Sequence, residues 1–191
     1  MRHPKSTALF AAVLIAVGSF SVLAACLVQD APKQTPAELR FKAPPEWVVE
    51  KPSSTMRLAQ YKLPKVDGDG EDASLVLYFF GTNQGGSVQA NVERWISQME
   101  QPDGSSSAKK AKQESLTVNQ LKIATIDLTG TYIAETAPGS SVRHNKPDFR
   151  LRAAVIETPK GTHYVKLVGP SKTVGHWDKA FNAYLQSFEF K

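Results

Sequence analysis

The chain has 191 residues, of which 41% are apolar, 21% charged and 9% aromatic. These proportions are typical of one globular domain and exclude a disordered chain of low hydrophobicity. The single cysteine excludes an intrachain disulfide and any multi-cysteine zinc or iron–sulfur site. Removing residues 1–25, with Arg2 and Lys5, would lower the net charge by two, from +5 to +3. So modest a charge does not indicate a nucleic-acid partner.

The first 29 residues have the pattern of an export signal. Residues 6–29 carry no charge, and Ala8–Val17 is an unbroken apolar stretch behind two basic residues. A positive start, an apolar region and then small residues are typical of a secretory signal peptide. An uncleaved membrane helix of about 20 apolar residues is the alternative. Gly18, Ser19 and Ser21 dilute the second half of the segment and favour cleavage.

The only cysteine follows three small or apolar residues in Leu23-Ala24-Ala25-Cys26. This motif resembles the lipobox of bacterial lipoproteins, in which the cysteine sulfur receives a diacylglyceryl group before cleavage on its amino side. Two or three acyl chains, such as palmitate, would hold the product on a membrane, whereas one chain binds reversibly. The alternative is a buried, unreactive cysteine. Leu27 in place of aspartate implies, by resemblance to proteobacterial sorting, an outer-membrane protein facing the periplasm.

The pattern therefore predicts three parts: a signal peptide over residues 1–25, a lipidated Cys26 with a flexible tether over 26–40, and one α+β domain over 41–191. The tether contains two prolines and few large apolar groups. Fully extended, it would reach about 50 Å from the lipid.

Several runs in residues 41–191 alternate in polarity or stay apolar, as strands do. The clearest hairpin joins the last two runs through Thr158-Pro159-Lys160-Gly161-Thr162, because proline and glycine provide turn angles. The expected strands are Met56–Leu63, Ser74–Phe80, Lys109–Val118, Leu121–Ile133, Phe149–Thr158 and Thr162–Val168.

Two segments have apolar residues at helical spacing. The first begins at Ser87, a suitable N-cap residue, and the second lies near the carboxyl end. Their apolar positions are Val88, Val92, Trp95, Ile96 and Met99, and Val174, Trp177, Phe181, Tyr184, Leu185 and Phe188. Short connections make the strands antiparallel, so we expect an α+β fold in which about six strands and two main helices form an α/β/α sandwich.

The domain expected over residues 41–191 resembles the PsbP-like and Mog1-like domains. The resemblance lies in Pro45-Glu46-Trp47, the Asn91–Met99 helix after Phe79-Phe80-Gly81, and the Tyr164–Pro170 strand followed by a helix ending Leu185-Gln186-Ser187-Phe188. The chain also resembles uncharacterised lipoproteins of planctomycete type, through Gly85, Gly86, Asn91, Arg94 and Trp95. The resemblance implies a sheet with helices on its faces. It also implies a role as an assembly or binding accessory, since members of the wider superfamily act in this way on photosystem II and on a nuclear GTPase. It implies no site residue.

The Gly81–Ser87 segment joins a strand to a helix, where backbone N–H groups can bind an anion. It lacks the P-loop lysine and the dinucleotide-binding glycine spacing. The sequence leaves open a ligand or anion site at Gly85, Gly86 and Ser87, with Arg150 nearby, and a simpler role of the glycines in backbone geometry. The second interpretation is favoured.

No metal or catalytic centre is predicted, and no cofactor. The acidic run Asp67–Asp72 could hold calcium, yet it departs from the EF-hand pattern and is better interpreted as a hairpin loop. His144, His163 and His176 have no metal-ligand spacing. His163 is in phase with two apolar strand residues, which favours a core position.

Five basic residues gather near one strand start: Arg143, His144, Lys146, Arg150 and Arg152. They could contact anionic lipid headgroups. They could equally keep a sheet edge soluble, which is the favoured interpretation.

The sequence thus favours an exported, membrane-anchored envelope lipoprotein whose non-enzymatic domain binds a partner protein or assists assembly. A small-ligand binding or transport accessory, with a pocket near Gly85, Gly86 and Arg150, is the alternative. An envelope hydrolase comes third.

Overall fold

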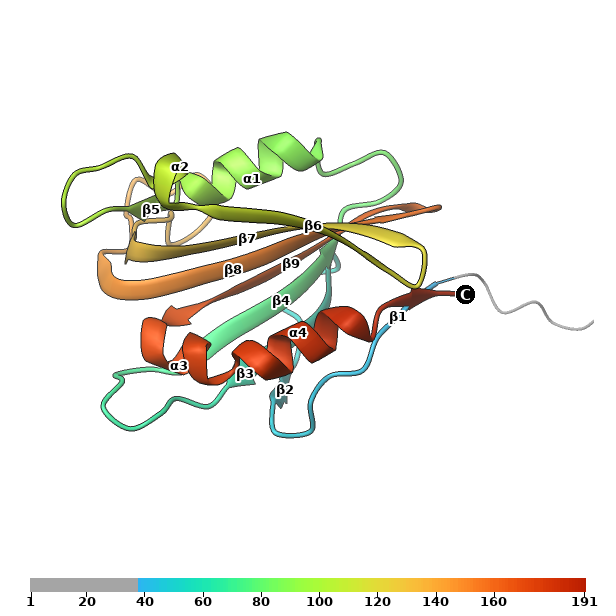
Figure 1. Ribbon diagram of the computed structural model, residues 1–191, viewed down its shortest axis with the longest axis horizontal. Coiled ribbons are helices and arrows are strands. Elements are labelled where there is room, and N and C mark those ends of the chain that lie inside the picture. Colours follow the sequence, from blue (N-terminus) through green and yellow to red (C-terminus); the bar gives the residue numbers. More distant parts are fainter. Residues whose placement is uncertain (1–37) are drawn as a thin grey trace, which may run out of the picture. The chain divides into compact units, whose positions relative to one another are not determined.

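An antiparallel sheet of eight strands dominates residues 38–191, the part of the chain that the computed structural model describes (Figure 1). Its strands follow the order β2-β3-β4-β9-β8-β7-β5, and β6 also pairs with β7. These strands are β2 (Val48–Glu50), β3 (Arg57–Leu63), β4 (Ala73–Phe79), β5 (Met99–Glu100), β6 (Lys112–Val118), β7 (Leu121–Tyr132), β8 (Lys146–Thr158) and β9 (Gly161–Pro170).

A second sheet of two strands joins β1 (Leu39–Arg40) to β10 (Glu189–Phe190). Leu39 and Phe41 pack against the core next to it. Leu39 and Arg40, which the sequence analysis placed in the tether, thus pair with the end of the chain. Two residues are too few to give a strand pattern in the sequence.

The α+β class and the antiparallel sheet are confirmed, whereas the expected number of about six strands was too low. The additional strands of the large sheet, β2 and β5, have three and two residues. The β8–β9 hairpin is confirmed, with Thr158 opposite Gly161. The strand expected from Lys109 begins only at Lys112, because the preceding residues form a short helix, α2 (Ser107–Lys110).

The first expected helix is α1 (Val88–Ile96), and Ser87 caps it by accepting a hydrogen bond from the Ala90 N–H at 3.1 Å. Met99 lies beyond it, in β5. The second expected helix is two helices, α3 (Ser171–His176) and α4 (Asp178–Gln186), which meet at Trp177. The Trp177 indole N–H donates to the Pro64 carbonyl at 2.9 Å and ties this junction to the end of β3.

Helices lie on both faces of the large sheet, with α1 and α2 on one side and α3 and α4 on the other (Figure 1). Alternate strand residues therefore enter two cores. On the α4 side, Leu75, Leu77, Val165 and Leu167 pack against residues such as Phe181. On the α1 side, strand residues that include Leu151, Val155 and Tyr164 pack with Val92 and Trp95.

The α1 helix is too short to cover its face of the sheet. Its nine residues span about 14 Å, whereas the ten residues of β9 span about 34 Å. The helix packs chiefly on β7 and β8. Much of the face formed by β3, β4 and β9 lies beyond it, and this is where the candidate site is found. None of the helices within residues 38–191 has the length and apolar character needed to cross a bilayer.

Candidate functional site

A pocket of about 630 Å³ lies beside α1 on the face formed by β3, β4 and β9. Its floor comes from the two neighbouring strands β4 and β9, and its walls come from α1, β3 and the segment between β7 and β8. We call it the α1-side pocket. Its volume is in the range of small-molecule sites in proteins.

Strand alternation determines the floor of the α1-side pocket. On β4 the residues that enter it are Ser74, Val76 and Tyr78, and on β9 they are Lys166 and Val168. The residues between them, Leu75, Leu77 and Leu167, point to the α4 side and are buried. The floor therefore combines apolar groups with one lysine and one phenol.

Lys166 lies in the middle of the floor and is partly buried. Its ammonium donates hydrogen bonds to Gln98 Oε1 at 2.5 Å and to the Tyr132 hydroxyl at 3.0 Å. Both partners are neutral. Burial, and to a smaller extent the nearby Arg94 guanidinium, lower the pKa of Lys166 to about 8.

The wall nearest α1 carries Arg94, and the β3 side carries Arg57. Arg94 donates to the Asn91 side-chain oxygen, and Arg57 Nη1 donates to Gln60 Oε1 at 2.7 Å. The Arg57 guanidinium also lies 5.6 Å from the centre of the Tyr78 ring. These cations, like Lys166, are thus held by neutral groups.

The third wall is the segment between β7 and β8, which contributes Arg143 and His144, together with Lys146 at the start of β8. A register shift opposite Gly130 and Tyr132, with Asp148 at a φ of +54°, interrupts the alternation of β8. Such a bulge changes the face on which a strand residue lies. Lys146 consequently lines the α1-side pocket, whereas Arg150 of the same strand lies on the opposite face.

Three acidic residues also line the α1-side pocket, and each has a partner. Glu71 forms an ion pair with Lys146 at 2.6 Å. Asp72 accepts a hydrogen bond from the Lys65 N–H at 2.9 Å, and Glu135 accepts one from the Gly139 N–H at 2.9 Å. Because these three carboxylates already have partners, the cations of the floor and of the α1 wall face the interior of the pocket without being neutralised by them.

The sequence-predicted group of Gly85, Gly86, Ser87 and Arg150 does not form one site. The first three residues precede α1, on the α1 side of the sheet, and Arg150 points to the α4 side. The prediction joined them because the sequence does not show which face each strand residue occupies.

The two glycines have a packing role that the structure makes explicit. Gly85 has a φ of +92°, and a Cβ atom there would lie 2.7 Å from the Tyr164 ring. The Tyr164 hydroxyl donates to the Gly86 carbonyl at 3.0 Å, and the Asn91 amide donates to the Gly85 carbonyl at 2.8 Å. Close approach of this loop to β9 therefore requires glycine at residue 85. The anion hypothesis for Gly85, Gly86 and Ser87 stays a prediction.

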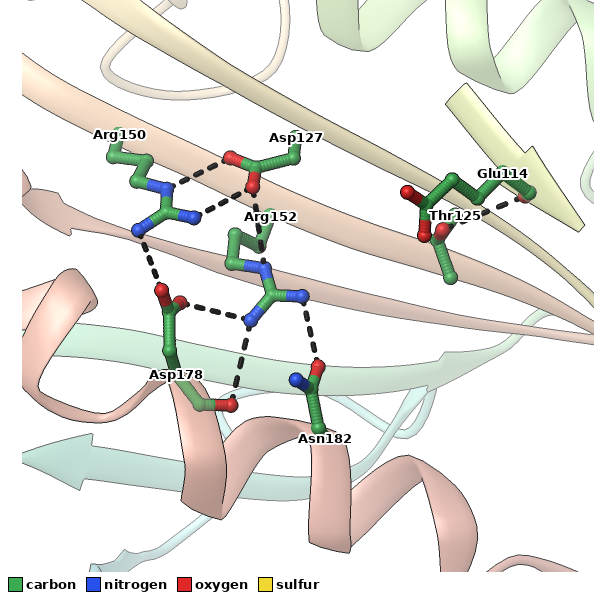
Figure 2. A network of polar contacts seen from close by, with 7 residues as sticks. All are labelled: Glu114, Thr125, Asp127, Arg150, Arg152, Asp178 and Asn182. Carbon is green, nitrogen blue, oxygen red and sulfur yellow. Dashed lines mark hydrogen bonds and ion pairs between the residues drawn. The ribbon is translucent and has the colours of Figure 1, made fainter. Parts of the chain in front are cut away.

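Arg150 belongs to a charge network between the sheet and the start of α4 (Figure 2). Its guanidinium donates to both carboxylate oxygens of Asp127, at 2.7 and 2.6 Å, and to Asp178 at 2.9 Å. Arg152 donates to Asp178 at 2.9 Å and to Asn182 at 2.9 Å. The hydrogen bonds to Asp127 are the main cause that raises the pKa of Arg150. Two arginines facing two aspartates balance in charge, so this network attaches α4 to β7 and β8.

Two other sequence predictions concern the amino terminus and the acidic loop. Cys26 and the preceding Leu23, Ala24 and Ala25 lie outside the described residues. In the acidic loop, Asp69 Oδ2 accepts hydrogen bonds from the Thr173 N–H at 2.9 Å and the Thr173 hydroxyl at 2.6 Å. Residues 38–191 contain no cluster of three metal-ligating side chains.

Sequence reasoning missed Lys166, Arg94 and Arg57 as members of one site. A signal existed for Lys166, which is a lone charge in the apolar strand segment Tyr164–Val168. The sequence contains no such signal for Arg57 and Arg94, because they come from distant parts of the chain and have the exposed-face spacing of ordinary strand and helix residues.

Comparison with known proteins adds a likeness in architecture. No protein-family model matches the sequence, and no curated protein matches it. Among solved structures, the cyanobacterial PsbP protein (CyanoP) of Synechocystis sp. PCC 6803 is 11% identical, with a TM-score of 0.45 over 86% of this chain and 99% of that chain. PA94, a protein of unknown function from Pseudomonas aeruginosa, is 15% identical, with a TM-score of 0.44 over 74% of this chain and 95% of that chain. These likenesses concern the fold alone.

Proposed function

We propose that this protein is a lipid-anchored binding protein of the bacterial envelope, whose domain holds a small ligand in the α1-side pocket. The single observation that supports ligand binding is the pocket itself, where an uncovered part of the sheet presents Lys166, Tyr78 and apolar floor residues to a space of about 630 Å³. A concave site with mixed apolar and converging polar groups is the usual form of a small-molecule site. The anchor rests on the lipobox-like segment that ends at Cys26.

A fragment screen tests the binding function. Saturation-transfer NMR on the full-length protein in detergent micelles, with neutral and charged fragments, should find compounds that bind. Ser74→Trp on the floor, or Ala137→Trp in the wall, should abolish their binding, because the indole would occupy the pocket. The matched control is Thr125→Trp, on a strand of the same sheet but pointing to the opposite face.

Fragments that bind Ser74→Trp and Ala137→Trp with the same affinity as they bind the unchanged protein would contradict the proposal. So would the absence of any bound fragment. Circular dichroism of each variant verifies that the fold is retained, and the wall variant serves where the floor variant does not fold.

A second candidate function, binding of a partner protein, is favoured by a different observation. Exposed apolar side chains lie on the edge strand β2, at the start of its neighbour β3 and on the residue just before β3. Val48, Val49, Leu58 and Met56 are 51%, 76%, 46% and 49% exposed. Within the described chain, β2 pairs with β3 alone. An exposed strand edge can accept an extended segment of another protein as an additional strand. Crosslinking from position 49 in native envelopes is the test.

A further inference from the structure

Three positive side chains converge on the α1-side pocket from three different elements. Arg57 comes from β3, Arg94 from α1 and Lys166 from β9. Within residues 38–191 none of them forms an ion pair, in contrast to Lys146, which is paired with Glu71 in the same pocket. Five lysines and arginines line the pocket against three acidic residues, so its lining has a positive excess.

This gathering of positive charge is electrostatically unfavourable by itself. An ammonium removed from water loses hydration, and a second cation nearby adds repulsion. Both effects act on Lys166, whose pKa they lower. Arg94 thus lies close enough to Lys166 to affect its ionisation, although neither residue forms an ion pair with any residue in the described part of the chain. A negatively charged ligand would remove both costs.

Two phenols complete the polar part of the pocket. Burial raises the pKa of Tyr132 to about 12 and also raises that of Tyr78, so both hydroxyls stay protonated at neutral pH. The Tyr132 oxygen accepts the hydrogen bond from Lys166, which leaves its own hydrogen free to donate. Tyr78 lies beneath the Arg57 guanidinium. The pocket therefore presents donors from three cations and two hydroxyls.

The rest of the lining suits an organic group. The Tyr132 ring stacks on His144, with centroids 5.3 Å apart, and lies nearly parallel to Phe149 at 6.2 Å. Val76 and Val168 form apolar floor beside Lys166. A ligand with a charged end and an apolar or aromatic body matches this division of the surface.

We propose that the ligand of the α1-side pocket is an organic oxyanion, a carboxylate or a phosphate monoester, whose charged group binds Lys166, Arg94 and Arg57. This inference rests on the proposed binding function and specifies its ligand class. Charge-assisted hydrogen bonds from arginine and lysine to oxyanions are stronger than neutral ones. The apolar body of the ligand lies against the stacked rings and the two valines.

Isothermal titration of the full-length protein with three probes of similar size tests the inference. The probes are benzoate, phenyl phosphate and neutral benzyl alcohol. Both oxyanions, or one of them, should bind at least about tenfold more tightly than benzyl alcohol, because hydrogen bonds to charged groups contribute more. The tighter of the two oxyanions identifies carboxylate or phosphate as the preferred group. Inorganic phosphate should bind more weakly than phenyl phosphate if the apolar body contributes.

Charge variants locate the binding. Lys166→Met and Arg94→Gln should each weaken oxyanion binding about tenfold and leave benzyl alcohol binding unchanged, because a hydrogen bond to an ion is lost. Arg94→Lys, which keeps the charge, should retain most of the affinity. Lys122→Gln, an exposed strand residue outside the pocket, makes the same change in net charge and should have no effect. Because Arg94 is exposed, its variants keep the test valid if Lys166→Met does not fold.

Equal binding of benzyl alcohol and of both oxyanions would overturn the inference and leave the binding function intact. Oxyanion binding that is unaffected by Lys166→Met and Arg94→Gln would also overturn it. Failure of all probes, neutral and charged, would contradict both the inference and the proposed function.

Discussion

At the scale of residues, two cations in neighbouring central strands have opposite surroundings. Arg150 on β8 faces Asp127 and Asp178, at 2.6 and 2.9 Å, so its charge is neutralised where it lies. Lys166 on β9 has two neutral hydrogen-bond partners. A paired charge between a sheet and a helix stabilises their packing only modestly once desolvation is counted, but it orients them. An unpaired one in a pocket is a candidate binding group.

His163 provides a prediction at the same scale. It is 5% exposed and stacks on Phe79 with centroids 4.5 Å apart, and burial lowers its pKa to about 4. In the unfolded chain the His163 imidazole would take up a proton below about pH 6.5, whereas in the folded protein it stays neutral down to about pH 4. Folding stability should therefore fall as the pH drops from 6.5 towards 4. Between pH 7 and 5 the loss through this group is about 2 kcal/mol.

Urea unfolding of the unchanged protein and of His163→Phe at pH 7 and pH 5 measures this contribution. The variant keeps a ring of similar size and lacks the titrating group, so its free energy of unfolding should fall less on acidification. His176→Phe is the control and should follow the unchanged protein. An identical pH dependence in His163→Phe and the unchanged protein would contradict the prediction.

At the scale of elements, the lengths of helices and the positions of edges decide which surfaces are open. On one face, α3 and α4 cover a core whose residues run from Trp47 to Phe188 in the chain. On the other, α1 has nine residues and leaves β3, β4 and β9 partly free. At one edge of the large sheet, β2 has three residues and presents exposed valines. Both candidate surfaces arise from short elements. The pocket is open because α1 is shorter than the strands beneath it, and the edge is exposed because β2 has only three residues.

The edge gives a prediction for crosslinking in native envelopes. A photoreactive amino acid in place of Val49 should yield a discrete crosslinked product, because this side chain is 76% exposed on the edge strand. A second change, Leu58→Lys, should reduce that product by placing a charge on the apolar edge. The same photoreactive residue at Gln120, in an exposed turn between β6 and β7, is the control. A product as abundant from position 120 would contradict the edge hypothesis.

At the scale of the whole molecule, the domain has one closed face and one open face. The charge network of Asp127, Arg150, Arg152 and Asp178 fixes α4 on the closed face (Figure 2). The α1-side pocket occupies the open face.

The proposed anchor is tested on the intact chain expressed in a bacterium. The substitution Cys26→Ser removes the thiol. It should move the protein from the detergent phase to the aqueous phase, because serine cannot receive the thioether-linked lipid. Ser21→Ala, in the same segment, should leave the partition unchanged. Intact-mass analysis should show an acylated chain that begins at Cys26. An unacylated chain that begins at Met1 would contradict the anchor.

Local patterns in the sequence were sufficient for the elements that are long and periodic. Strands β3, β4, β7, β8 and β9, helix α1 with its cap at Ser87, and the β8–β9 hairpin were all predicted within a few residues. These predictions succeed because hydrophobic period and turn chemistry act over neighbouring residues. The short strands β1, β2, β5 and β10 were not predicted, since two or three residues form a strand only when a distant partner is present.

The sequence by itself determined the α+β class, the antiparallel sheet and the amphipathic helices, and it supplies the whole case for lipidation of Cys26. Only the tertiary structure decided which charges share a surface. It separated Arg150 from Gly85 and Gly86, and it brought Lys166, Arg94 and Arg57 together from positions far apart in the chain. The reason is that the face of a strand residue depends on bulges, and the openness of that face depends on the length of the helix above it.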